Sequence, residues 1–292
     1  MTTGCFICGS AGFSEGTPGY RRCENCGHEV LVAGQEQVFM VNDDLGSPTA
    51  SRPSWLEKFQ AHVLFTFSDG GHGSLVDVGC GAGRFLISVA GRFKRACGVE
   101  ISPQSVEFAR RQGLEIVGGL DDVDGPIDVA TAWHSLEHFP AAALEKLVET
   151  LSTRLARGGC VIVSVPNAAS WQCRWLGRRY AFYDPPRHLQ QFTPDSLNRL
   201  FTRHGFVRTG AAISWPYNVF GWIQGLLNLV MPGHNYIYYR LKRGISRVSA
   251  ARDAVGLLLV PIVAGPALLL SMCEALNPDE QSVLTWRFAM RP

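Results

Sequence analysis

The feature that most constrains the fold is a glycine-rich segment at residues 77–84, which reads Asp-Val-Gly-Cys-Gly-Ala-Gly-Arg. A short apolar run at residues 75–78 predicts a strand, and the pattern at residues 84–93 predicts a helix. Glycine at Gly79 and Gly81 permits a tight turn between the two and lets a ligand approach the backbone closely. The helix N-terminus beyond the turn can hold an anionic group. We therefore expect a strand–turn–helix unit with a ligand site at its turn.

Short apolar runs alternate with helical patterns through most of the remaining chain. Strands are expected at residues 75–78, 96–100, 114–117, 127–133, 160–165, 206–214 and 282–289. Helices are expected at residues 55–67, 84–93, 103–112, 141–155 and 194–204, with a loop at residues 181–193. Strands interleaved with helices form parallel βαβ units. The predicted fold class is therefore α/β, a Rossmann-like doubly wound sheet of seven strands.

Glu100 ends the second expected strand, about twenty residues beyond the turn, where a carboxylate can accept both hydroxyls of a ribose. The pattern is not the dinucleotide fingerprint, because its third glycine falls one place early, at Gly83, and is followed by Arg84. With Asp77 ahead of the turn, this D-x-G-x-G-x-G form resembles motif I of the class I S-adenosylmethionine-dependent methyltransferases. The resemblance covers most of residues 54–215. A nicotinamide enzyme or a purely structural turn is the alternative.

The resemblance implies S-adenosylmethionine as the cofactor. Residues 133–139 (Trp-His-Ser-Leu-Glu-His-Phe) follow the fourth expected strand and are similar to the "LEH" segment of the quinone-biosynthesis-like methyltransferases. Glu100 would bind the ribose, and Leu120 with Asp121 would lie beside the adenine. The expected cofactor-binding residues are Asp77, Gly79, Cys80, Gly81, Gly83, Glu100, Leu120, Asp121 and His134.

Three histidines, at positions 134, 138 and 188, fall near the expected mouth of the site. Methyl transfer from a sulfonium depends largely on positioning, and an oxygen acceptor also benefits from a general base such as histidine. Residues 184–189 resemble the "D-x-P-R-H" loop of the same group, so we expect His188 to act as a base or orient the acceptor. Arg187 would hold an anionic part of the substrate. In the alternative, this loop is only braced by hydrogen bonds. His138 is expected mainly to order the loop after the fourth strand, and a base role for it is less favoured.

Four of the nine cysteines form two Cys-x-x-Cys-Gly pairs near the N-terminus, at Cys5, Cys8, Cys23 and Cys26. Their spacing is typical of a four-thiolate zinc ribbon. A redox pair is the alternative, but neither pair opens a helix beside a strand. Zinc contributes about 10–16 kcal/mol in small zinc peptides, which would explain how so short a segment folds. We predict a structural Zn²⁺ in a ribbon at residues 1–35, followed by a linker at residues 36–53.

The expected methyltransferase domain, residues 54–292, contains an insertion at residues 218–275 where a minimal class I enzyme has a short hairpin. The insertion has two apolar runs, at residues 219–231 and 254–273. The second carries no charge and is long enough to span a bilayer. Its prolines and a glycine, Pro261, Gly265 and Pro266, are expected to break it.

Aromatic and basic residues lie between the two runs, as expected at a lipid headgroup layer. They are Tyr236, Tyr238, Tyr239, Arg240, Lys242, Arg243 and Arg247. Because both strands that flank the insertion are expected in one sheet, a single membrane crossing is excluded. We predict peripheral membrane contact, in preference to a soluble cap or a dimer interface.

The predicted function is S-adenosylmethionine-dependent methylation of a small or lipid-linked acceptor, at oxygen. A sugar C-methyltransferase and a ribosomal RNA guanine methyltransferase with N-terminal zinc are the alternatives. The first would carry a further C-terminal domain, and a net charge of +2 with no Asn-Pro-Pro-Tyr motif disfavours nucleic acid. A non-catalytic membrane-associated scaffold is a further alternative. It would require a disrupted cofactor-binding loop, whereas the glycine-rich segment at residues 77–84 is intact. Residues 1–8 lack a secretory signal, so we expect a cytoplasmic protein in peripheral contact with the cytoplasmic face of the membrane.

Overall fold

The computed structural model describes residues 4–32, 54–68, 73–231, 234–238 and 250–291. The predicted linker at residues 36–53 lies outside this part of the chain, as do Tyr239, Arg240, Lys242, Arg243 and Arg247.

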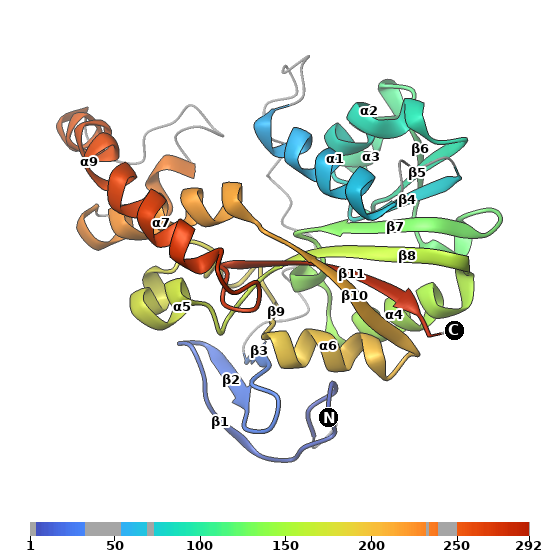
Figure 1. Ribbon diagram of the computed structural model, residues 1–292, viewed down its shortest axis with the longest axis horizontal. Helices are drawn as coiled ribbons and strands as arrows, with labels where there is room; N and C mark the ends of the chain where they lie inside the picture. Colours follow the sequence, from blue (N-terminus) through green and yellow to red (C-terminus); the bar gives the residue numbers. More distant parts are fainter. Residues whose placement is uncertain (1–3, 33–53, 69–72, 232–233, 239–249, 292) are drawn as a thin grey trace.

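A seven-stranded sheet forms the centre of the molecule, in the order β10-β11-β8-β7-β4-β5-β6 (Figure 1). Its strands are β4 (Ser74–Val78), β5 (Arg95–Val99), β6 (Glu115–Val117), β7 (Ile127–Trp133), β8 (Leu155–Pro166), β10 (Phe206–Ala212) and β11 (Val283–Met290). The strands from β8 to β6 pair in parallel, and β11 is antiparallel to both β8 and β10. All seven predicted strands and the α/β fold class are confirmed.

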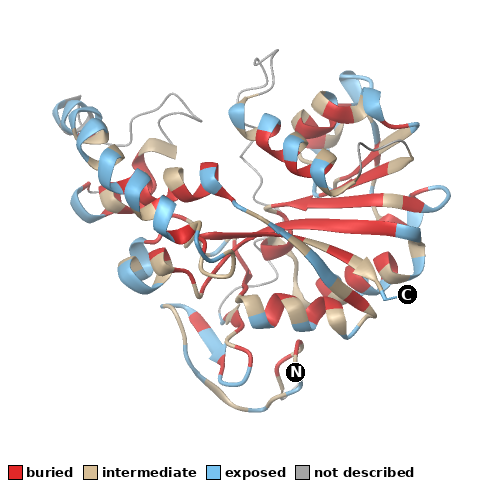
Figure 2. Ribbon diagram, in the orientation of Figure 1, coloured by how far each residue is buried: buried red, intermediate tan, exposed pale blue. Residues whose placement is uncertain are grey.

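Helices cover both faces of this sheet, with α1 and α2 on one face and α4 and α6 on the other (Figure 1). The helices of the sheet layers are α1 (Trp55–Phe67), α2 (Arg84–Val89), α3 (Pro103–Arg111), α4 (Ala141–Arg154) and α6 (Pro194–Thr202), with a short α5 (Trp171–Leu176) at one end. Short 3₁₀ turns lie at Ala90–Arg92, Leu120–Asp122, Leu136–His138 and Gly177–Arg179. A capping box starts α1, because Ser54 and Glu57 bond to each other's backbone amides. Figure 2 shows the central strands buried between these layers.

The N-terminal segment forms a second sheet, in the order β1-β2-β3-β9. Its own strands are β1 (Phe13–Glu15), β2 (Tyr20–Cys23) and β3 (Glu29–Leu31). The fourth strand, β9 (Gln190–Gln191), belongs to residues 181–193, which we predicted to be a loop without a strand. That prediction is wrong at these two residues. A two-residue strand has no periodicity of its own and exists only because β3 pairs with it.

The insertion leaves the sheet at β10 and returns at β11, which are adjacent and antiparallel. It forms two packed helices, α7 (Trp215–Val230) and α9 (Ala250–Glu274). The expected break at Pro261, Gly265 and Pro266 is wrong, because α9 runs through all three. Each proline removes one backbone hydrogen bond, but its fixed φ is compatible with a helix. Within the described residues, Ala254–Glu274 is long and apolar enough to cross a membrane, and 17% of its most apolar window is buried.

Candidate active site

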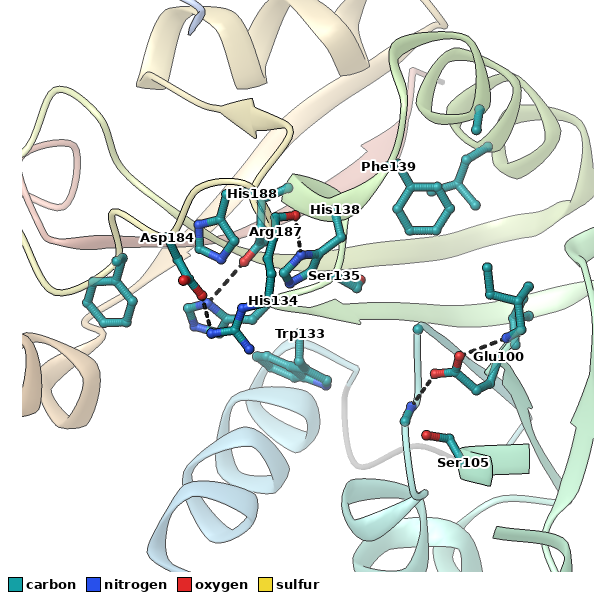
Figure 3. Close-up of a pocket in the computed structure, with 18 of the residues that line it drawn as sticks. Glu100, Ser105, Trp133, His134, Ser135, His138, Phe139, Asp184, Arg187 and His188 are labelled. Carbon is teal, nitrogen blue, oxygen red and sulfur yellow. Dashed lines mark hydrogen bonds and ion pairs between the residues drawn. The ribbon is translucent and has the colours of Figure 1, made fainter. Parts of the chain in front are cut away.

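A large pocket, of about 930 Å³, lies at the carboxyl ends of the parallel strands (Figure 3). Open α/β sheets bind ligands at this edge, and the volume lies within the usual range of ligand sites. One end is formed by the glycine turn and the residues after β5 and β6. The other end is formed by the loops after β7 and β8, together with α1 and α7.

The glycine turn faces the pocket through Gly79 and Gly81. Gly79 has φ +71°, and a Cβ built there would lie 2.6 Å from the Cβ of Ser135. Gly81 has φ +53°, and a Cβ there would meet no atom of the described residues within 4 Å. The backbone at Gly81 is therefore open to a ligand. Cys80 and Gly83, which we also predicted to bind the cofactor, do not line the pocket.

Glu100 holds the turn in place while facing the pocket. Its Oε2 accepts a hydrogen bond from the Gly81 amide at 2.8 Å. Its Oε1 accepts from the amide of Ile101 at 2.7 Å (Figure 3). It also accepts from the amide of Ser102 at 2.8 Å. These bonds fix the carboxylate, and its remaining lone pairs can accept from ribose hydroxyls. Leu120 and Asp121 line the same end of the pocket, as expected for residues beside an adenine.

Asp77 is buried beneath the turn and does not line the pocket. Its Oδ1 accepts a hydrogen bond from the Thr131 hydroxyl at 2.6 Å. Burial raises the pKa of Asp77 to about 7, against the effect of the Thr131 bond and with a further contribution from the charge of Glu100. Asp77 can therefore affect cofactor binding only by supporting the turn above it, without contacting the cofactor.

The loop after β7 places His134, Glu137 and His138 in the pocket wall. His134 has φ +50°, unusual for a residue other than glycine, and its Nδ1 lies 3.3 Å from Glu137 Oε1. The His134 ring also lies 4.5 Å from the ring of Tyr217. Burial raises the pKa of Glu137, but the contact with His134 and the other nearby histidines lower it to about 2. The lowered pKa favours the ionised form of this buried carboxyl group.

The loop after β8 brings His188 to the same place, across the pocket wall from His138. The two rings are 4.9 Å apart and nearly perpendicular. Burial and the nearby His138 lower the pKa of His188 to about 4, so its ring is neutral near pH 7 and a weak base. Arg187 forms an ion pair with Asp184, which matches the alternative in which this loop is braced internally.

Several aromatic residues that line the pocket were not among the site residues predicted from the sequence. Phe182 stacks on His134, and Tyr217 and Phe220 reach the pocket from α7 of the insertion. The Tyr217 hydroxyl accepts a hydrogen bond from Gln60 of α1, at 3.1 Å. The aromatic start of the insertion was the available signal, but only the fold brings it to this edge of the sheet.

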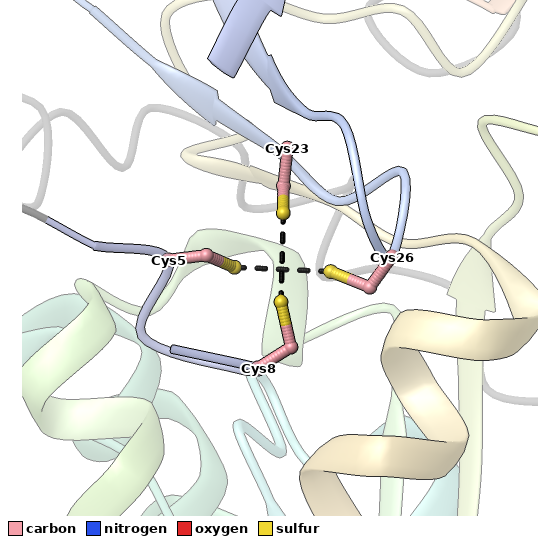
Figure 4. A group of neighbouring side chains, drawn as sticks. All are labelled: Cys5, Cys8, Cys23 and Cys26. Atoms are coloured by element: carbon pink, nitrogen blue, oxygen red, sulfur yellow. Dashed lines mark hydrogen bonds between the residues drawn. The ribbon is translucent and has the colours of Figure 1, made fainter. Parts of the chain in front are cut away.

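The four N-terminal cysteines converge on one point (Figure 4). The Sγ atoms of Cys5 and Cys26 are 3.7 Å apart, and those of Cys8 and Cys23 are 3.5 Å apart. A tetrahedral zinc ion with Zn–S bonds of about 2.3 Å has its sulfur atoms about 3.8 Å apart. The cluster therefore has the dimensions of a four-thiolate zinc site, with no position left for a substrate.

Known protein families and sequences similar to this chain agree with a cofactor site at the glycine turn. The family described as "Methyltransferase domain" matches residues 54–209, more than half of the chain. A ubiquinone biosynthesis O-methyltransferase from Chromobacterium violaceum is 28% identical over an alignment of 147 residues, and the match covers 44% of this chain and 62% of that protein. The chain thus spans less than two thirds of that relative's length.

Two solved structures share the fold. The cyclopropane synthase MmaA2 from Mycobacterium tuberculosis has a TM-score of 0.52 at 13% identity, covering 88% of this chain and 98% of that chain. A geranyl diphosphate C-methyltransferase from Streptomyces coelicolor A3(2) has a TM-score of 0.50 at 17% identity, covering 81% and 80%. With the family match and the glycine turn, the chain is a member of the class I S-adenosylmethionine-dependent methyltransferases.

Proposed function

We propose that this enzyme methylates an oxygen atom of an apolar acceptor, either a small molecule or one linked to a lipid. The observation that carries the proposal is the composition of the pocket end that faces His188. Phe182, Tyr217 and Phe220 supply aromatic surface there, beside the polar side chains of the loops after β7 and β8. The similarity to a ubiquinone biosynthesis O-methyltransferase supports oxygen as the acceptor atom.

The cofactor would bind at the opposite end of the pocket. Gly79 and Gly81 would let it approach the backbone, Glu100 would accept the ribose hydroxyls, and Leu120 with Asp121 would contact the adenine. His134 would lie near the methyl group to be transferred. His188 and His138 would face the acceptor, and Arg187, paired with Asp184, would hold their loop.

The insertion would bring the enzyme to a membrane surface. Leu258, Ile262 and Leu269 lie on α9 with 71%, 66% and 66% of their surface exposed. Their spacing puts them on one stripe of the helix, so the stripe could lie in the interface of a bilayer. The sequence between α7 and α9 is basic, which favours anionic lipid. Because Tyr217 and Phe220 belong to α7, an acceptor could pass from lipid toward the pocket beside the insertion.

The N-terminal cysteines would bind one structural Zn²⁺. Their sulfur spacing supports this, and so does the small size of the segment, which has few large apolar residues of its own. The zinc would stabilise the ribbon against the loop of His188 rather than take part in methyl transfer.

Incubation with isotope-labelled S-adenosylmethionine tests the acceptor. Lipid, soluble and RNA fractions of a cell extract would each be incubated with the enzyme and analysed by mass spectrometry. We expect a methyl ether on a lipid or on an apolar small molecule of the soluble fraction, formed by the wild type and lost in Gly81→Val. Label confined to RNA, or to carbon atoms of soluble sugars, would contradict the proposal.

A further inference from the structure

We propose that Glu137, His138 and His188 form a second metal site, which binds a divalent first-row transition metal at the acceptor end of the pocket. The ligand atoms of these three residues lie within 4.8 Å of one another. All three residues line the pocket. The proposal deepens the proposed O-methylation, on which its catalytic part rests.

Glu137 is the first reason to expect a cation. Its side chain is fully buried, on the short 3₁₀ turn after β7. Oε1 faces His134 Nδ1 at 3.3 Å, whereas neither carboxylate oxygen has a hydrogen bond of good geometry to any residue that the structure describes. A buried carboxylate that is not fully hydrogen-bonded is costly unless a cation compensates it. The Glu137 oxygens therefore lack the partner that a metal ion would supply.

His138 has the arrangement that metal-binding histidines usually have. Its Nδ1 lies 2.9 Å from the backbone carbonyl of Arg187. A carbonyl oxygen can only accept, so Nδ1 carries the proton and Nε2 keeps a lone pair. Histidines that bind metals commonly donate their other N–H to a carbonyl or carboxylate in this way.

His188 completes the set from a different part of the chain. Its ring is nearly perpendicular to that of His138, with centroids 4.9 Å apart (Figure 3). Its Nδ1 is buried and has no hydrogen-bond partner within the described part of the chain. One carboxylate and two imidazoles thus converge, each with a lone pair that no described residue uses fully.

This ligand set indicates the class of metal. Two imidazoles and one carboxylate suit Zn²⁺, Mn²⁺, Co²⁺ or Fe²⁺, whereas Mg²⁺ and Ca²⁺ prefer oxygen ligands alone. Three protein ligands leave coordination positions open to the pocket, unlike the closed four-cysteine cluster. An acceptor hydroxyl could occupy an open position.

The metal would make the acceptor oxygen a better nucleophile by stabilising its deprotonated form. The hydroxyl proton passes to solvent, and the oxygen forms a bond to the methyl carbon of S-adenosylmethionine. The carbon–sulfur bond breaks, and its electron pair stays on sulfur as the neutral thioether. No oxidant or reductant is needed.

Titration of the full-length protein, purified with its ribbon metal, with Mn²⁺ tests the site by electron paramagnetic resonance. We expect one bound Mn²⁺ per chain, with coupling to histidine nitrogen. Glu137→Gln and His188→Ala should each weaken Mn²⁺ binding at least about 10-fold. His62→Ala, which replaces an exposed histidine of α1, is the matched control and should bind as the wild type does.

Circular dichroism and S-adenosylmethionine affinity show whether each variant is folded. Wild-type protein that binds no Mn²⁺ at millimolar concentration would overturn the proposal, as would folded Glu137→Gln and His188→Ala variants with unchanged Mn²⁺ affinity. If Mn²⁺ binds as expected but the transferred methyl appears on RNA or on carbon, the metal site stands and the proposed function fails. If methyl ethers form without added metal and at full rate in Glu137→Gln, O-methylation stands and the metal's catalytic role fails.

Discussion

The Tyr20 hydroxyl donates a hydrogen bond of 2.7 Å to the backbone carbonyl of His188. The two residues are 168 positions apart, and the bond joins the N-terminal ribbon to the loop of the acceptor-site histidine. The amide of Leu31 donates to the carbonyl of Leu189 beside it, at 3.0 Å. The ribbon therefore supports the wall of the active site directly.

Tyr20→Phe should loosen that loop without affecting the cofactor end of the pocket. The variant leaves the His188 carbonyl without its buried donor, at a cost of about 1–3 kcal/mol. Hydrogen exchange measured by mass spectrometry should be faster at residues 184–191 and unchanged at residues 77–84. Tyr183→Phe is the matched control, because its hydroxyl also donates to a ribbon carbonyl, at Pro18, but in an exposed position. Equal protection of the loop in all three proteins would contradict the prediction.

Cys23→Ser should abolish zinc binding. One ligand of the four would be lost, so metal analysis should give close to one zinc per chain in the wild type and little in the variant. Cys273→Ser, which replaces an exposed cysteine outside the cluster, should keep the metal. We expect the seven-stranded sheet to remain formed and residues 184–191 to lose protection. Wild-type protein with less than about half an equivalent of zinc, purified without chelator, would rule out the zinc ribbon.

Gly81→Val should weaken S-adenosylmethionine binding at least about 10-fold, because the side chain would fill the space that the ligand needs. Gly113→Val is a matched control for backbone strain. Gly113 also has a positive φ, +81°, and open space around it, but it is exposed and does not line the pocket. Calorimetry should separate the two variants. Equal affinities would place the cofactor elsewhere.

Asp77 should make the protein less stable as the pH rises from its ordinary pKa of 3.8 to about 7. Its pKa is about 7 in the folded protein and 3.8 in the ordinary case. At pH values between 3.8 and about 7, the Asp77 carboxyl group has lost its proton in the unfolded chain but keeps it in the folded chain. The unfolded state therefore binds fewer protons, and stability falls as pH increases toward about 7.

Asp77→Asn removes this contribution while keeping an acceptor for the Thr131 hydroxyl. Urea denaturation at pH values of about 5 and 8 should show a larger loss of stability in the wild type than in the variant. Parallel losses would mean that Asp77 is already ionised in the folded protein.

Leu258→Glu combined with Leu269→Glu should abolish binding to anionic liposomes. Both side chains lie on the exposed stripe of α9, and charge there opposes burial in lipid. Ile87→Glu, on α2, replaces an exposed apolar residue away from the insertion and should float as the wild type does. Wild-type protein that stays soluble at low salt would instead make the α9 stripe a cap or a dimer contact.

The sequence was sufficient for the features that depend on local patterns. The strand ending at Val78, the turn at Gly79 and the acid at Glu100 were predicted because each leaves a mark within a few residues. The parallel sheet followed from the alternation of such units. The cysteine cluster was predictable because four ligands at fixed spacing have few other uses.

Features that depend on distant parts of the chain were not predictable. β9 exists because β3 pairs with it, and two residues carry no strand pattern. Tyr217 enters the pocket because the insertion folds back over α1, where Gln60 bonds to it. The continuity of α9 through Pro261 also contradicts local propensity, in a helix that packs against α7.

The pairing of β3 with β9 means that the small sheet cannot be completed until β9 has been synthesised. His28 and Gln190, which are hydrogen-bonded, are 162 residues apart. At about 5–20 residues per second, a ribosome needs on the order of 10–30 seconds to make the intervening chain. Throughout that interval the β3 edge has no partner, and an unpaired edge can recruit other strands. The small sheet is thus begun early and completed late in synthesis, and a nascent chain released before residue 190 would expose an open strand edge.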